Sequence, residues 1–358
     1  MNRKSSRRDF LQGKPVRDAA AARATSAGAA AESLLVHVSR RAMACEFEVQ
    51  LNAGQYDHGT QAALETLDQL DRLEDRLSVF REHSEICQIN RAAADEPVQL
   101  EPALFDLLEL GMRLHAETDG AFDLTCGPLW ETWGFARRDG AVPDEEDLAE
   151  AMKCVGSHLV ELDAECRTVR FREEGVRLNL GGIGKGYALD RCCQSMSDAG
   201  IEDYLIHGGG GSSAAAHGCR RHATSRTDDV AGCGWTIGVP HPLRPNRRLA
   251  EIRLLDRALA TSGSQVQSFV HRGRRYGHIL DPRTGWPAEG VLSATVLAPT
   301  ATLADALSTA FYVMGPDKAL EYCETRPEIA ALLVCPIRHS GGAEIRTAGL
   351  TEDELTLY

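Results

Sequence analysis

The stretch that decides the fold runs from residue 278 to residue 314, opening with HILDPRTGWP (278–287) and closing with PTATLADALSTAFYVM (299–314). Apolar side chains recur in the closing part at three- and four-residue spacing, which predicts an amphipathic helix. They are Leu303, Leu307, Ala310, Phe311 and Met314. Thr302 precedes this run, where its hydroxyl is expected to cap the first turn. Asp305 and Thr309 stand four residues apart, so their oxygen atoms leave neighbouring turns on one side of the helix.

A carboxylate and a hydroxyl presented together suit a hard cation such as Mg²⁺, which prefers oxygen ligands and commonly also binds a substrate phosphate. The alternative is that Asp305 is a solvated first-turn acid favoured by the helix dipole, and that Thr309 is a surface hydroxyl. The pair alone favours this alternative. The rest of the chain favours the metal site.

The composition indicates an acidic globular protein. The 358 residues carry a net charge of −13, with 43% hydrophobic and 25% charged side chains. The first 30 residues hold seven basic side chains against two acids, a net of +5, so the remainder carries −18. A body this acidic repels phosphate backbones, and nucleic acid is therefore not expected as a partner. An anionic cofactor would need a metal ion or local donors to overcome this field.

Cysteine usage and the N-terminus indicate opposite compartments. The eleven cysteines are scattered without a C-x-x-C pair, which fits neither a disulfide framework nor a zinc site and favours a reducing compartment. SRRDFLQGK (6–14), by contrast, resembles a twin-arginine export motif. The apolar segment that should follow is interrupted by Arg17, Asp18 and Arg23. No run is long enough for a transmembrane helix.

We therefore divide the chain into a flexible or targeting tail (residues 1–32) and one domain (residues 33–358). Export to the periplasm or cell envelope and retention in the cytoplasm both stay open.

Periodicity predicts the elements of the domain. SLLVHVSRRAM (33–43) and CEFEVQLNA (45–53) predict a β-hairpin or two successive strands. Helices are predicted over 59–77, about 102–117 and about 145–153. The first carries a leucine stripe that is expected in the core, consisting of Leu64, Leu67, Leu70, Leu73 and Leu77. Strands are predicted at TVRFR (168–172), VRLNL (176–180), WTIGVPHP (235–242) and EIRLLDRALATSG (251–263), the last ending in a sharp polar turn at Thr261, Ser262 and Gly263.

Two further stretches carry chemistry. In VRLNLGGIGKGYALD (176–190) a strand enters a glycine cluster that contains Lys185, and a helix begins at about Tyr187. Backbone N–H groups at a helix start, together with a lysine, can cradle an anion, although the spacing is not that of a Walker A loop. In TDGAFDLTCGPLWETWGF (118–135), a predicted loop, the aromatic residues either stack on a planar ligand or form a small satellite core; they are Trp130, Trp133 and Phe135.

Eight motifs, spread in order over roughly residues 40–335, resemble those of the ApbE family of FAD:protein FMN transferases. They are AMACEF, LSVFREHSEICQIN, TDGAFDLTCGPLWETWGF, LNLGGIGKGYALD, LIHGGG, ALATSG, YGHILDPRTGWP and LADALSTAFYVMG. The resemblance implies an α+β fold, ApbE-like and related to the T-fold, with mixed sheets flanked by helices and a central flavin-binding cleft. It also implies Mg²⁺-dependent transfer of FMN from FAD to a Ser or Thr hydroxyl of an acceptor flavoprotein, with release of AMP. A membrane-associated acceptor is among the candidate partners.

The resemblance also implies the site. The Mg²⁺ ligands would be Asp305, Thr309 and the backbone carbonyl of Gly182, and Ser308 matches a position where some members supply an oxygen. FAD contacts would come from Met43, Phe80, the turn Ala121, Phe122 and Asp123, Asn179, Lys185 and the backbone of Leu280.

His278 matches the family histidine beside the reaction centre, and its near-neutral pKa suits a general base. The alternative is an ordinary loop histidine bonded to a backbone carbonyl. Asp305 is the second residue expected to be catalytic, and Asp281 is expected to shape the turn before Pro282.

The chain departs from the family at three places. Ala44 and Cys45 replace the usual Gly-Thr, and His207 with the glycine run 208–211 and the insertion 219–234 replaces a tighter loop. These changes leave the ligands intact but put access of the acceptor in doubt. The same site with water as acceptor would make an FAD pyrophosphatase that yields FMN and AMP. A flavin-binding protein without turnover is a further alternative, which the presence of His278 and Asp305 disfavours.

Overall fold

The computed structural model describes residues 34–209, 213–217, 234–263, 267–337 and 341–358. The predicted tail (residues 1–32) with its twin-arginine-like motif, the glycines at 210 and 211, and almost all of the 219–234 insertion lie outside these residues. Among the described helices, none is both long and apolar enough to cross a membrane.

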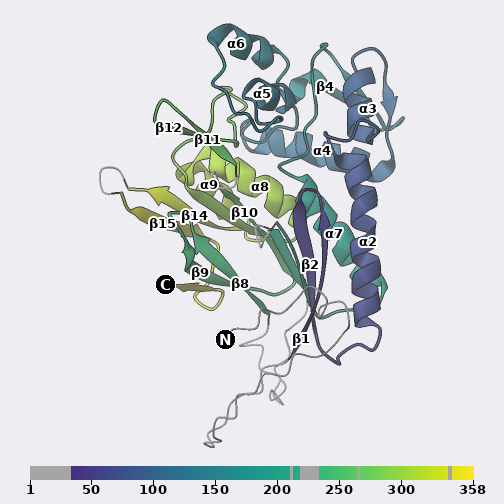
Figure 1. Cartoon of the computed structure of the whole chain (residues 1–358), viewed down its shortest axis with the longest axis vertical. Helices are drawn as coiled ribbons and strands as arrows, with labels where there is room; N and C mark the ends of the chain where they lie inside the picture. The colour runs from purple at the N-terminus through teal and green to yellow at the C-terminus, as the bar shows by residue number, and fades with distance from the viewer. Residues whose placement is uncertain (1–33, 210–212, 218–233, 264–266, 338–340) are drawn as a thin grey trace, which may run out of the picture.

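An antiparallel sheet of eight strands runs through the middle of the molecule (Figure 1). Its order is β1-β2-β6-β7-β10-β13-β14-β15. The α+β class is thus confirmed, whereas the implied mixed sheets are not found, because every described strand pair is antiparallel. The strands are β1 (Leu35–Ala42), β2 (Cys45–Asn52), β6 (Tyr204–Gly208), β7 (Ser213–His217), β10 (Arg257–Gly263), β13 (Ser293–Ala298), β14 (Ala330–Pro336) and β15 (Ala343–Ala348).

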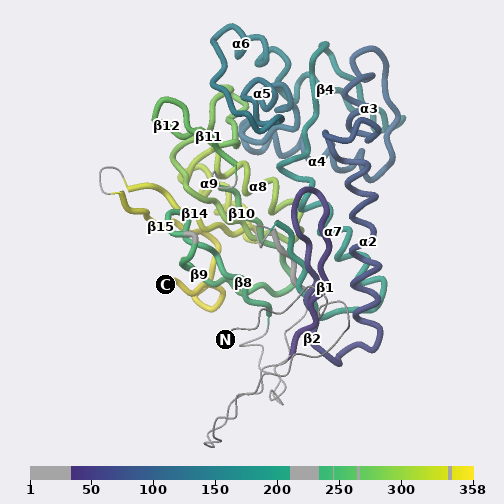
Figure 2. The backbone as a smooth tube through the Cα atoms, in the orientation of Figure 1, coloured from purple at the N-terminus to yellow at the C-terminus, as the bar shows by residue number. Residues whose placement is uncertain are grey.

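Helices cover one face of this sheet in the order of the strands beneath them (Figures 1 and 2). Helix α2 packs on β1 and β2, α7 on β6 and β7, α8 on β7, β10 and β13, and α9 on β14 and β15. Their apolar sides form the main core together with the inner face of the sheet. The four helices are α2 (Gly59–Leu77), α7 (Gly184–Asp198), α8 (Ala301–Met314) and α9 (Pro316–Glu324).

A smaller sheet, β16-β9-β8, covers part of the opposite face. Trp235 and Ile252 of the small sheet share a buried cluster with Leu259 and Leu297 of the large one. Strand β13 is consequently buried along its whole length and reads as a continuous run of small and apolar residues rather than an alternation. The small-sheet strands are β8 (Trp235–His241), β9 (Arg244–Leu254) and β16 (Leu355–Leu357).

The remaining elements lie together beyond one end of the large sheet, at the top of Figure 1. A separate cluster of buried side chains, among them Leu129, Trp133, Phe135 and Leu280, forms a satellite core there. The elements are α3 (Glu85–Ala92), α4 (Pro102–Glu117), α5 (Gly127–Thr132), α6 (Glu145–Lys153), the 3₁₀ helix η1 (Ser157–Leu159), the sheet of β3 (Val98–Gln99), β5 (Thr168–Phe171) and β4 (Val160–Asp163), and the hairpin of β11 (Ser268–His271) and β12 (Arg274–Gly277).

Most predicted elements are confirmed. The hairpin turns at Met43 and Ala44, both with positive φ, which matches the right-handed twist of its strands. Helices α2, α4 and α6 fall where periodicity places them. The leucine stripe is buried except for Leu64, which is 46% exposed and therefore outside the core.

Several local predictions were wrong. The predicted loop 118–135 contains helix α5 (Gly127–Thr132). Residues 176–180 form no strand, because the side chain of Asn90 in α3 takes the place of a partner strand: its Oδ1 accepts from the Leu178 N–H and its Nδ2 donates to the Leu178 carbonyl. Residues 261–263 are not a turn but the end of β10, paired with β13. Helix α7 begins at Gly184, not near Tyr187, which brings Lys185 into its first turn.

Candidate active site

The start of helix α8 is held by a residue that the sequence did not single out. The carboxylate of Asp190, on α7, accepts from the N–H groups of Ala301 (2.7 Å) and Thr302 (2.9 Å) and also from the Thr302 hydroxyl. Thr300, not Thr302, is the N-cap, with its hydroxyl oxygen 3.3 Å from the Leu303 nitrogen. The predicted cap at Thr302 was therefore wrong, because its hydroxyl donates across to the neighbouring helix.

Helices α7 and α8 touch through their backbones at Gly186. A Cβ at this glycine would lie 2.1 Å from the carbonyl oxygen of Ala301 and 2.8 Å from Cβ of Asp305, which leaves no room for a side chain. The approach allows the Gly186 N–H to donate to Oδ2 of Asp305 at 2.9 Å. Close packing thus places the acid of one motif against the glycine cluster of the other.

Asp305 is buried, with only 6% of its side chain exposed, so the solvated first-turn acid considered as the alternative is excluded. Its second oxygen, Oδ1, lies 3.6 Å from Nζ of Lys185, and the same Nζ lies 3.4 Å from the Gly181 carbonyl. A buried carboxylate with one amide and one distant ammonium retains the capacity to bind a cation.

Three hydroxyl groups lie together near the backbone of Asp305. Ser262, at the end of β10, places its Oγ 2.9 Å from Oγ of Ser308 and 3.2 Å from Oγ1 of Thr309. Ser308 and Thr309 also lie within 2.9 Å and 3.4 Å of the Asp305 carbonyl oxygen. Ser262 was missed because its segment was interpreted as a turn, although β10 runs without interruption through the buried residues 258–260 to Gly263.

Gly182 completes the cluster. A Cβ there would stand 3.4 Å from Oγ1 of Thr309 and 3.3 Å from the Phe122 ring, so the glycine turn, helix α8 and the 118–125 turn meet at one point. Every donor gathered here is an oxygen, the ligand type that Mg²⁺ prefers. Within the described residues, no group of three or more His, Cys, Asp or Glu side chains is placed to hold a metal.

A cleft of about 360 Å³ ends at Asn179, whose Oδ1 accepts from the Gly181 N–H at 2.9 Å, but the oxygen cluster itself does not line it. Phe80 is 66% exposed at its edge, with its ring centroid 6.1 Å from that of Trp130, so these two aromatics can face a planar ligand. Trp133 and Phe135 instead belong to the satellite core. The lining residues are Val79, Phe80, Cys87, Asn90, Arg91, Gly127, Trp130, Glu131, Ala136, Arg177, Leu178 and Asn179.

His278 is half-buried between the hairpin β11–β12 and the predicted FAD contact Leu280. Its Nδ1 lies 3.0 Å from the Gln267 carbonyl, and because a carbonyl only accepts, Nδ1 carries the proton and Nε2 keeps a free lone pair. Burial lowers the pKa of His278 below its ordinary value near 6.5, so the neutral form prevails at neutral pH. The backbone bond foreseen in the alternative interpretation is present, and it orients the ring as a base requires.

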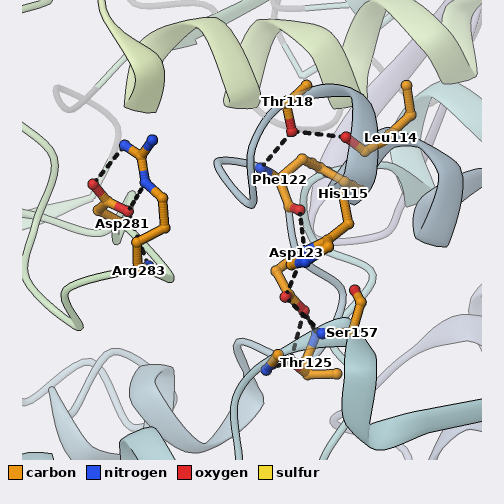
Figure 3. A network of polar contacts seen from close by, with 10 residues as sticks. Leu114, His115, Thr118, Phe122, Asp123, Thr125, Ser157, Asp281 and Arg283 are labelled. Carbon is orange, nitrogen blue, oxygen red and sulfur yellow. Dashed lines mark hydrogen bonds and ion pairs between the residues drawn. The ribbon is translucent and has the colours of Figure 1, made fainter.

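The turn that follows His278 is built as expected. Asp281 accepts from the Arg283 N–H at 3.0 Å and pairs with its guanidinium at 2.8 Å (Figure 3). The Trp133 indole N–H donates to the Gly285 carbonyl at 2.8 Å, which ties this turn to the satellite core. Leu280 is buried and forms an isolated bridge with Pro287.

The other predicted contact residues lie around the same region. Ala121 and Phe122 are buried, and the Asp123 carboxylate is engaged inside the protein, so its side chain is not free to meet a ligand. Met43 lies in the β1–β2 turn beside Cys45. Burial raises the pKa of the Cys45 thiol, the charge of Lys185 lowers it and that of Asp305 raises it, which places this turn within electrostatic reach of the site.

An α+β fold in which carboxylate, hydroxyl and carbonyl oxygens gather beside a glycine-rich helix start is chemically suited to a phosphorylated ligand and a hard cation. The comparison with known proteins is more specific. The sequence profile of the ApbE family matches residues 43–333, and the chain belongs to this family.

The chain is 29% identical to the FAD:protein FMN transferase of Haemophilus influenzae over 303 residues, which cover 82% of the chain and 84% of that protein. It is 31% identical to the FAD:protein FMN transferase of Escherichia coli K12 over 260 residues, which cover 71% of each chain. The ApbE protein of Thermotoga maritima superposes with a TM-score of 0.74 at 32% identity, over 87% of this chain and 96% of that one.

Proposed function

We propose that this chain is an FAD:protein FMN transferase, an enzyme that moves FMN from FAD onto an acceptor flavoprotein. The observation that carries the proposal is the meeting of Asp305, Thr309 and Gly182 with Lys185. A cleft edged by aromatic rings reaches Asn179, three residues before Gly182. Relatives that are about 30% identical over 71–82% of this chain bear this activity in their names. The site residues and the metal are the part of the proposal that experiment has to test.

Mg²⁺ fits the donors present. Asp305, Thr309 and the Gly182 carbonyl would hold it, with the Ser308 and Ser262 hydroxyls available nearby. When bound, the ion supplies neutralising charge for the pyrophosphate of FAD and for its departing oxygen. The −18 charge of the body makes such a countercharge necessary.

The chain's own residues supply binding, orientation and proton transfer. Lys185 would contact the pyrophosphate, while Phe80 and Trp130 would contact the ring system. The Gly184 and Gly186 N–H groups at the start of α7 are engaged with the Leu180 carbonyl and with Asp305. The reaction forms a bond between the acceptor hydroxyl oxygen and the phosphorus of the FMN half, and breaks the bond from that phosphorus to the bridging oxygen. AMP leaves with that oxygen.

His278 would take the proton of the attacking hydroxyl on Nε2. Its Nδ1 is fixed by the Gln267 carbonyl, so the imidazole cannot rotate away without losing a hydrogen bond. We propose a Ser or Thr as the acceptor residue, since a hydroxyl is the nucleophile that a neutral imidazole of lowered pKa can serve. A membrane-associated acceptor and export of the chain stay predictions.

The test incubates the purified chain with FAD and Mg²⁺, with and without EDTA and with and without an acceptor flavoprotein, and follows AMP, FMN and protein-bound flavin by chromatography. AMP release that depends on the metal, with flavin covalently on the acceptor, is the expected result. Equal amounts of AMP and free FMN regardless of acceptor would identify a pyrophosphatase instead. Retained FAD without any AMP would leave a flavin-binding protein and refute the catalytic assignments.

A further inference from the structure

A buried ion pair joins helix α4 to the turn that carries the predicted FAD contacts Ala121 and Phe122 (Figure 3). His115, in the last turn of α4, places Nδ1 2.8 Å from Oδ2 of Asp123 and 3.2 Å from the carbonyl oxygen of Phe122. Only 1% of the Asp123 side chain is exposed, against 27% for His115. The contact is therefore made inside the protein, where it is screened far less than a surface ion pair.

The Asp123 carboxylate organises the whole turn. Besides His115, it accepts from the N–H and hydroxyl of Thr125, at 2.7 Å and 2.5 Å, and from the Ser157 N–H at 3.0 Å. Thr118 fixes the other side of the turn, since its hydroxyl donates to the Leu114 carbonyl and accepts from the Phe122 N–H. Of the groups that bind this carboxylate, His115 is the one whose charge changes near neutral pH.

This turn is also in direct contact with the proposed flavin site. The Phe122 ring packs against Gly182, and the Leu124 carbonyl accepts from the Asn179 N–H at 2.7 Å. Asn179 lines the cleft. A change in the shape of the turn therefore reaches the predicted Mg²⁺ ligand Gly182 through a packing contact and the predicted FAD contact Asn179 through a hydrogen bond.

Other charges near His115 are engaged with partners of their own. The side chain of Arg283 approaches Gly120 from the opposite side to His115, but its guanidinium is paired with Asp281. Next to the turn, Asp119 pairs with Lys318. Glu117, two residues along α4, pairs with Arg326 and accepts from the Tyr322 hydroxyl. Asp123 is thus the carboxylate that sets the charge state of His115.

We propose that His115 is a positioning residue: as an imidazolium it holds the 118–125 turn in the shape that receives FAD, so that FAD affinity falls when His115 loses its proton. The inference rests on the proposed function, because FAD is its ligand. His115 does not touch the reacting atoms and acts through Asp123 and Phe122.

The direction of the pH effect follows from the pair. The hydrogen bond to Asp123 raises the pKa of His115 above its ordinary value near 6.5. The imidazolium is therefore complete below 6.5 and is lost as the pH rises through the raised pKa. A neutral imidazole with its proton on Nδ1 keeps the hydrogen bond but not the charge, so FAD affinity should fall only about fivefold, the difference between a charge-assisted and a neutral hydrogen bond.

The experiment measures the Kd for FAD of the full chain by equilibrium titration between roughly pH 6 and pH 9, without acceptor. His115→Asn is the informative variant, since its amide nitrogen lies where Nδ1 was and donates without ever carrying charge. His115→Ala removes the donor as well. His37→Asn is the matched control, because His37 pairs with Glu48 at 2.8 Å on the β1–β2 hairpin but is 51% exposed.

We expect the Kd of the wild type to rise about fivefold with pH, and that of His115→Asn to stay at the wild-type high-pH value throughout. His37→Asn should keep the wild-type profile. His115→Ala should bind more weakly at every pH, and at saturating FAD the kcat of His115→Asn should equal that of the wild type. Thermal melting identifies a variant that fails to fold. If His115→Ala fails to fold, the pH dependence of FAD binding by His115→Asn alone tests the inference.

A pH dependence in His115→Asn equal to that of the wild type would overturn the inference, and so would a wild-type Kd that does not change with pH. A wild type that binds no FAD at any pH would refute the proposed function itself. The two failures are distinguishable because the first occurs in a chain that binds FAD.

Discussion

Replacing Gly186 with alanine should separate helices α7 and α8 and disable the site. The new Cβ would meet the Ala301 carbonyl oxygen at 2.1 Å and its carbon at 2.6 Å, whereas ordinary contact begins near 3.4 Å. Both atoms belong to backbone, which cannot rotate aside. The helices must therefore move apart by about 1 Å, an overpacking that typically costs about 1–3 kcal/mol.

The same movement weakens the hydrogen bond from the Gly186 N–H to Asp305, a bond to a charged group that contributes about 1.5–3 kcal/mol. Alanine returns about 1 kcal/mol through its better helix propensity. The net loss of unfolding free energy is about 3 kcal/mol, which lowers the Tm by about 4 °C in a domain of this size. The rate of FMN transfer should fall by more than the loss of folded protein explains, because Asp305 moves with α8.

The assay compares thermal and urea unfolding of Gly186→Ala with that of Gly184→Ala, and measures AMP release by both. Gly184 lies in the same first turn of α7, but a Cβ there meets only Cβ of Leu180 at 3.8 Å. That variant should match the wild type or gain up to about 1 kcal/mol. If the two substitutions had equal effects on unfolding, or Gly186→Ala kept full activity, the proposed backbone contact and its role would be wrong.

Three further changes test other parts of the site. Asp305→Asn keeps an acceptor for the Gly186 N–H but loses the negative charge. Mg²⁺-dependent AMP release should therefore drop at least about a hundredfold, with an unchanged Tm. Undiminished turnover would refute the metal assignment. Because the pKa of His278 is lowered, the rate of transfer to an acceptor should rise with pH below pH 6.5, as the imidazole loses its proton. This acidic limb of the pH–rate profile should be absent in His278→Ala. Its persistence in that variant would assign the limb to another group. Asp190→Ala should lower the free energy of urea unfolding by about 2 kcal/mol, because three donors lose their acceptor. Thr300→Ala, which removes the N-cap, should lower it by about 1 kcal/mol. The reverse order would show that the ordinary N-cap dominates.

Local pattern was sufficient for features that one segment forms by itself. The three- and four-residue spacing placed α2, α4 and α8, and it put Asp305 and Thr309 on one side of α8. The glycine cluster identified the start of a helix beside Lys185, although three residues too late. These features depend on backbone geometry within a few residues, which the sequence expresses directly.

Side-chain partners far apart in sequence were decided by the tertiary structure. Asp123 was expected to meet FAD, yet its carboxylate is bound by His115, Thr125 and Ser157. Ser262 was interpreted as part of a turn, yet it meets Ser308 across 46 residues. No periodicity marks such pairs, because they depend on which elements pack together.

The sequence by itself determined the family motifs, the positions of most helices and the oxygen chemistry of α8. The tertiary structure decided that α7 and α8 approach until Gly186 donates to Asp305, 119 residues away, and that Asp190 caps α8 from 111 residues away. The physical reason is that a buried carboxylate must find donors wherever packing brings them, and packing is a property of the whole sheet and its helices rather than of any one stretch.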